Sequence, residues 1–149
     1  MRKLLSSTAV MLVMAVAVMA ARKPSRSAQA DAPFPGTLRN ARYVYVAAYD
    51  GDQFNPNLLP EDRDAIANVQ NAIQKWGKLV LVYSPGDADI ILLVESRPSE
   101  DVLALYDARM PGGQYLWRAM GRGGLQAGET PLLTKFEKGF ESVQVKVSK

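Results

Sequence analysis

Hydrophobic and polar positions alternate with a period of two in the segment 42–49, RYVYVAAY. In a strand, one side would carry Tyr43, Tyr45, Ala47 and Tyr49, and the other side Val44, Val46 and Ala48. The pattern therefore predicts a β-strand with one aromatic side and one aliphatic side.

A helical period replaces this alternation in the segment 60–76. Four apolar residues recur there at spacings of three or four and form one stripe: Ile66, Val69, Ile73 and Trp76. Pro60 suits a first helical turn, and Gly77 is a typical helix end. We expect an amphipathic helix whose stripe, including Trp76, faces the core.

Further apolar segments predict four strands and a second helix. The strands are expected at 79–83, 88–95, 102–107 and 114–122, and the helix, with Pro131 at its first position, at 131–143. A hairpin turn is expected at 110–113. The run 88–95 is apolar without alternation, which is typical of a central strand covered on both faces. The element order predicts an α+β domain in two layers, a mixed β-sheet of about five strands with two helices on one face.

The first 30 residues predict an export signal. Arg2 and Lys3 precede 18 residues without charge, 4–21, and a small-x-small cleavage site follows at 28–30, with an earlier alternative at 18–20. An uncleaved membrane anchor is the alternative, because 18 residues reach the short end of spanning length. Basic residues at 22, 23 and 26 would resist translocation.

The charge balance changes if this signal is removed. The chain of 149 residues has 18 basic and 15 acidic residues, but five basic and no acidic residues precede position 31, which leaves 13 against 15, net −2. No basic patch then argues for nucleic acid, and a membrane contact would come only through an uncleaved N-terminal segment. We expect a signal peptide at 1–30, a Pro- and Gly-containing linker at 31–40 and a single domain at 41–149.

The chain contains no cysteine and no histidine. Disulfide frameworks, thiolate metal sites, cysteine nucleophiles and Ser-His-Asp triads are therefore excluded. Enzymatic activity is left undecided with non-catalysis favoured, and no cofactor is expected. Carboxylates remain the candidates for acid–base chemistry, at Asp50, Asp52, Glu95 and Asp107.

Asp50 and Asp52 have part of the spacing of a calcium-binding loop. Glu61 stands at the twelfth position, but Phe54 replaces a ligand and Asn55 replaces the glycine of that loop. A capped turn that leads into a helix is the alternative. In the segment 123–130, the spacing resembles a phosphate-binding loop, but Glu129 replaces the lysine that such a loop requires.

Aromatic side chains supply the main candidate binding surface. If the helices cover the Val44 side of the first strand, its tyrosines line the opposite face. The candidate contact residues are Tyr43, Tyr45, Tyr49, Tyr115 and Trp117. The alternative is that these aromatics pack against one another across strands and lie under a loop.

Two segments carry a resemblance to a known group of proteins. GDADIILLVE at 86–95 and YDARMPGGQYLWRAMGR at 106–122 resemble small bacterial envelope domains in which an "ADI" strand precedes a D-turn-G-x-x-L-W-R hairpin and a C-terminal helix. The matching residues are Ala88, Asp89, Asp107, Gly113, Leu116, Trp117 and Arg118. The folds of that group resemble the amino-terminal α/β domain of the Tol-system periplasmic protein. Many members are lipoproteins, but this chain lacks the cysteine for lipidation.

The resemblance implies no catalytic residue. We expect an exported protein, periplasmic or tethered to the inner membrane, that acts as a non-enzymatic interaction module and contacts an envelope protein or a second copy of itself. The alternatives are a small-ligand or divalent-ion binder and a carboxylate-dependent periplasmic hydrolase.

Overall fold

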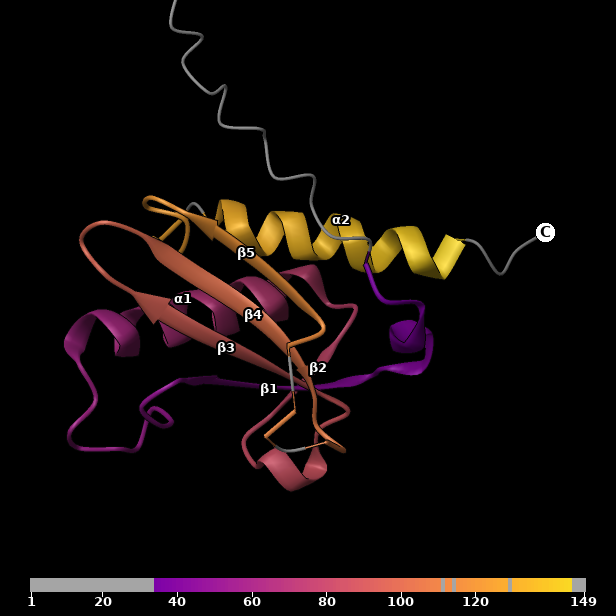
Figure 1. Ribbon diagram of the computed structural model, residues 1–149, viewed down its shortest axis with the longest axis horizontal. Helices are drawn as coiled ribbons and strands as arrows, with labels where there is room; N and C mark the ends of the chain where they lie inside the picture. Colours follow the sequence, from indigo (N-terminus) through magenta and orange to yellow (C-terminus); the bar gives the residue numbers. More distant parts are fainter. Residues whose placement is uncertain (1–33, 111, 114, 129, 146–149) are drawn as a thin grey trace, which may run out of the picture.

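The computed structural model describes residues 34–145 except 111, 114 and 129, so the expected export signal lies outside the described residues. The strands are β1 (Tyr43–Ala48), β2 (Val80–Val82), β3 (Ile90–Ser96), β4 (Asp101–Asp107) and β5 (Trp117–Gly121). The helices are α1 (Pro60–Trp76) and α2 (Pro131–Val145), with short 3₁₀ turns η1 (Gly36–Asn40) and η2 (Pro85–Asp87). These elements confirm the predicted order and the α+β class (Figure 1).

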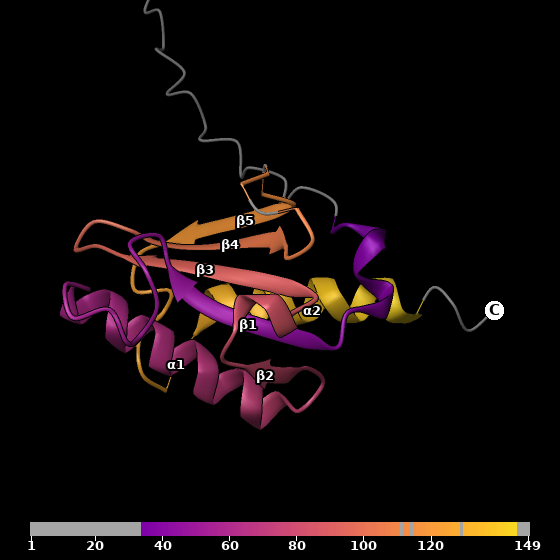
Figure 2. The same ribbon diagram turned by 90° about the horizontal axis from the view of Figure 1, so that it is seen from below.

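The five strands form one mixed sheet in the order β2-β1-β3-β4-β5, which Figure 2 shows from one edge to the other. β1 pairs in parallel with both β2 and β3, whereas β3–β4 and β4–β5 are antiparallel hairpins. Because β2 and β3 flank β1, the connection between them, which contains η2, crosses β1. The segment predicted as the central strand forms β3, which lies in the middle of the sheet.

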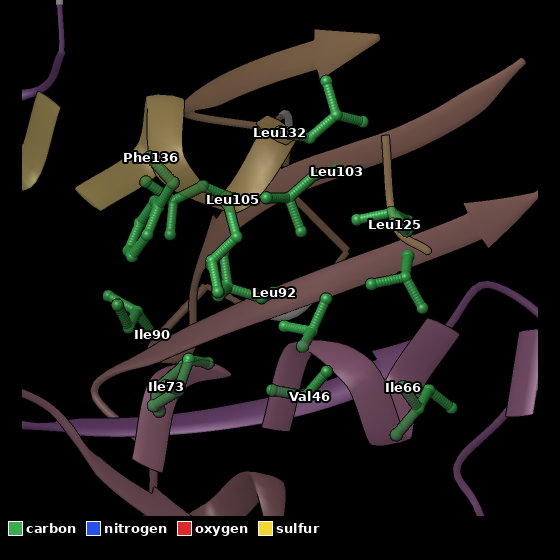
Figure 3. Close-up of a cluster of buried hydrophobic side chains, with 14 of the residues drawn as sticks. Val46, Ile66, Ile73, Ile90, Leu92, Leu103, Leu105, Leu125, Leu132 and Phe136 are labelled. Carbon is green, nitrogen blue, oxygen red and sulfur yellow. The ribbon is translucent and has the colours of Figure 1, made fainter. Parts of the chain in front are cut away.

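Both helices pack on one face of the sheet. Aliphatic residues that alternate along the strands meet Ile66 and Ile73 of α1 and Leu132 and Phe136 of α2 (Figure 3). Val44, Leu92 and Leu105 are among the strand residues that this layer buries completely. The expectation that β3 is covered on both faces is therefore wrong: the helices cover one face, and Ile91 and Leu93 are only half-buried on the other.

Helix α1 follows the predicted stripe closely. Ile66, Val69 and Ile73 are fully buried. Trp76 is partly buried, and its ring packs edge-on against Phe140 with the ring centroids 5.5 Å apart. Gly77 ends the helix in the left-handed region at φ 72°, which favours glycine. The apolar spacing thus set both the position and the orientation of this helix.

The domain begins before the predicted boundary at residue 41. Leu38, inside the expected linker, is 4 % exposed and belongs to the core. Phe34 packs against the rings of Trp117 and Phe136. Only the described helices can be judged for membrane crossing, and none of them is long and apolar enough.

Candidate functional site

The face of the sheet opposite the helices is the candidate binding surface, and we call it the open face. Strand alternation and register place on it Tyr43, Tyr45 and Ala47; Val80 and Val82; Ile91, Leu93 and Glu95; Val102, Ala104 and Tyr106; and Arg118 and Met120. Ala47 and Ala104 are buried on this face, on either side of half-buried Leu93. Larger side chains are half exposed around it, including Tyr43 at 44 % and Met120 at 42 %.

A row across three strands defines the middle of the open face. Tyr45 of β1 lies opposite Ile91 of β3, which lies opposite Tyr106 of β4. The Tyr45 hydroxyl donates a hydrogen bond to Asp52 Oδ2 over 3.3 Å. Burial, and then the Asp52 carboxylate, raise the pKa of Tyr45. The hydroxyl of Tyr45 is thus held by the loop that follows β1.

Tyr49, which directly follows β1, contacts this row. Its hydroxyl lies 3.4 Å from the Tyr106 hydroxyl. The pKa of Tyr49 is raised to about 12, first by burial and then by the hydrogen bond with Tyr106, while the Arg118 guanidinium acts in the opposite direction and Glu95 adds a small increase. Tyr106, Arg118 and Glu95 therefore all lie close enough to affect the pKa of the Tyr49 phenol.

Two of the five predicted aromatic residues do not belong to the open face. Trp117 is 3 % exposed and lies in the core, where it pairs with Leu105 and contacts Phe34 and Phe136. The prediction that it shares a patch with the tyrosines is wrong, because β5 turns this side towards α2. Tyr115 is exposed but lies ahead of β5, in the connection from β4, and not on a strand of the open face.

Two residues that were not among the predicted contact residues lie on the open face. Arg118 lies beside Ala104 on the open face, and Tyr106 faces Tyr49. The period-two alternation of β4 contains the signal for Tyr106, but the pairing with β3 that places it beside the β1 tyrosines is a long-range contact. The open face therefore joins Tyr43, Tyr45 and Tyr49 with Tyr106, Arg118 and Glu95.

Asp50 and Asp52, the candidate metal ligands, have other partners. Asp52 Oδ1 accepts the Phe54 amide at 2.9 Å, which is the capped-turn alternative, and its Oδ2 accepts the Tyr45 hydroxyl. Asp50 lies 3.8 Å from the Arg97 guanidinium. Within the described residues, no group of three potential ligands is arranged to hold a metal ion.

Arg97 is the centre of a charged cluster at the C-terminal ends of β1 and β3. Its Nη1 lies 2.9 Å from both carboxylate oxygens of Asp62, and its Nη2 lies 3.3 Å from Glu95. Asp62 is 1 % exposed and also accepts the Ser96 amide at 2.7 Å. The cluster ties the first turn of α1 to the end of β3.

The candidate carboxylates for acid–base chemistry fall into separate places. Asp50 and Glu95 both contact Arg97. Asp107 lies at the other end of the sheet, opposite Ile90, and accepts the Arg109 amide in a turn. Asp52 is engaged by the turn that it caps. The four carboxylates are thus distributed over a salt-bridge cluster and two turns.

No family model, curated protein or solved structure matches this chain.

Proposed function

We propose that this chain is an exported protein of the bacterial cell envelope that acts without catalysis, by binding a second copy of itself through the open face. The observation that carries the proposal is the sheet face that both helices leave uncovered. Aromatic and apolar side chains that are half-buried or half-exposed lie along it, including Tyr43, Tyr45 and Leu93. Contiguous surfaces of this kind mark sites of protein contact.

The shape of the open face favours a protein partner over a small ligand. Four hollows on the described surface are lined by residues other than those of the open face. A sheet face lined by half-buried aromatic and aliphatic side chains suits packing against another sheet, as in two-layer β-sandwiches. Tyrosine is also enriched among residues that dominate binding energy.

Charge on the open face favours a second copy over an unrelated partner. Glu95 and Arg118 lie on the same face with opposite signs, on neighbouring cross-strand rows. In a two-fold interface each residue faces the other copy, so one positive and one negative group on the same surface can pair reciprocally. Glu95 also lies 3.3 Å from Arg97 of its own chain, so in such a dimer it would bridge Arg97 and the Arg118 of the second copy.

The sequence adds the location. The apolar segment 4–21 with its cleavage site predicts export, and the segments 86–95 and 106–122 resemble small bacterial envelope domains. The absence of histidine and cysteine from the whole chain agrees with a role that depends on contact rather than on catalysis.

Sedimentation of the exported protein over a range of concentrations tests the proposal. Tyr43→Ala and Arg118→Glu should each remove about 1–2 kcal/mol of binding energy and so weaken the dimer by about five- to thirtyfold. Tyr115→Ala is the matched control, because Tyr115 is an equally exposed tyrosine outside the open face, 51 % against 44 % for Tyr43. Its dimer should be unchanged.

Circular dichroism must show that each variant is folded. A folded parent protein that stays monomeric at every concentration would overturn the proposal, and so would equal weakening by Tyr115→Ala. A monomer that binds a different envelope protein through Tyr43 would also overturn the assignment to a second copy.

A further inference from the structure

A groove of about 790 Å³ lies away from the open face, between η1, the turn after α1 and the last turns of α2. Its walls are Arg39, Asn40, Ala41 and Arg42 on one side, Lys78 on another, and Phe140, Glu141 and Gln144 on the third. Figure 1 shows η1 beside the C-terminal half of α2. Three separate segments of the chain therefore bring cationic and polar groups to one hollow.

The groove carries more positive than negative charge. Its acid, Glu141, is already engaged: Lys78 Nζ lies 2.8 Å and Trp76 Nε1 3.0 Å from its Oε1, and these bonds lower its pKa. Among the described residues, neither Arg39 nor Arg42 has a carboxylate within ion-pair distance. Two guanidinium groups are thus left for a ligand, in a chain whose segment from residue 31 onwards is net acidic.

The backbone on which these arginines stand is fixed. Gln144 donates its side-chain amide to the Arg39 carbonyl at 2.9 Å. The Arg42 amide donates to Asp89 Oδ2 at 2.9 Å, and the Arg42 carbonyl accepts the Val80 amide at 2.7 Å. Both arginines therefore project from anchored positions, which reduces the ordering cost of binding.

We infer that this groove binds the phosphate group of an anionic ligand. A guanidinium fork matches phosphate oxygens, and a phosphate group offers three oxygens that can accept hydrogen bonds from cations on different walls. The buried Phe140 ring adds an apolar floor, which suits a phosphate that is attached to an organic body. The phosphate source is either a soluble phosphomonoester or a phospholipid headgroup.

Two probes distinguish these sources. The first is glycerol phosphate, titrated into isotopically labelled exported protein at low ionic strength and followed by amide chemical shifts. The second is a set of vesicles of phosphatidylglycerol in phosphatidylcholine, compared with phosphatidylcholine alone in a flotation assay. Saturable shifts at residues 39–42, 78 and 144 with glycerol phosphate support a soluble ligand, and binding to the phosphatidylglycerol vesicles alone supports the headgroup.

The double variant Arg39→Ala/Arg42→Ala should weaken whichever binding is observed by about tenfold or more, given the strength of charge-assisted hydrogen bonds. The matched control is Lys135→Ala/Lys138→Ala, which removes the same charge from exposed positions of α2 outside the groove. The control should keep the parent affinity.

Three results would overturn the inference: no binding of either probe, shifts confined to other parts of the surface, or equal loss in the control variant, which would indicate non-specific charge attraction. Self-association through the open face does not enter any of these readouts, so the two proposals fail or hold independently.

Discussion

The ring of Phe34 occupies the space that a side chain at position 139 would fill. A Cβ atom built on Gly139 would come within 2.5 Å of the Phe34 ring. Glycine in the middle of α2 is costly for a helix, by about 1 kcal/mol relative to alanine. Here it admits an aromatic ring from a segment before the first strand, and that ring also contacts Trp117 and Phe136.

The effect of Gly139→Ala on the free energy of unfolding should therefore depend on whether Phe34 is present. In the parent chain, the new methyl group displaces Phe34, and we expect a loss of about 1–3 kcal/mol in the free energy of unfolding. In a Phe34→Ala background the obstacle is gone, and the same change should stabilise α2 by up to about 1 kcal/mol. Urea unfolding of the four proteins measures both effects. Stabilisation in both backgrounds would show that Phe34 does not occupy this space.

The salt bridge between Arg97 and buried Asp62 gives a second prediction. Arg97→Ala leaves the Asp62 carboxylate buried, with the Ser96 amide as its remaining hydrogen-bond partner among the described residues. The free energy of unfolding should therefore fall by about 2 kcal/mol or more. Lys78→Ala breaks an exposed ion pair, with Glu141, and should cost less than about 1 kcal/mol. Equal losses in the two variants would contradict the structural role of the Arg97 cluster.

Tyr49 predicts a pH dependence on the alkaline side. Its pKa rises from 10.0 in the reference state to about 12 in the folded domain, so its contribution to stability is complete below pH 10 and is lost as the pH rises through about 12. Titration of tyrosinate absorbance should contain a component near pH 12 that Tyr49→Phe removes. Tyr106→Phe should shift that component to lower pH. A parent titration without such a component would contradict the hydrogen bond between the Tyr49 and Tyr106 hydroxyls.

Export is predicted by the first 30 residues. Mass spectrometry of the protein from its native envelope should find Asp31 at the N-terminus, because the small-x-small site ends at Ala30. Full-length protein in the membrane fraction would favour the uncleaved anchor. Full-length protein in the cytosol would contradict export and, with it, the proposed location.

The sequence predicts the elements of this domain better than it predicts their faces. The helix 60–76 and the strand 42–49 each have a single clear period, and the structure has them within a residue of the expected bounds. Around β5 the alternation separates Trp117 and Ala119 from Arg118 and Met120, but it does not show which of the two faces of the sheet each pair occupies. The rings of Phe34 and Phe136, which are both distant from Trp117 in sequence, pack against it on the core side of the sheet.

Asp62 illustrates the same limit for a charged residue. Its position in the first turn of α1 suits the positive end of the helix dipole, so local reasoning accounts for it on an exposed surface. The structure buries it because β3 ends where α1 begins and Arg97 follows directly. The same limit applies to the open face, because its residues come from five strands and the local pattern does not show how these strands pair.

Burial of the open face by a second copy is tested most directly with a single cysteine. The chain has no native cysteine, so Met120→Cys on the open face and Gln74→Cys on the exposed side of α1 each give one thiol. The rate of alkylation is measured over a range of protein concentrations. We predict that the thiol at position 120 becomes protected as the concentration rises, while the thiol at position 74 reacts at a constant rate. A rate at position 120 that is independent of concentration, in a folded protein, would contradict the proposed dimer.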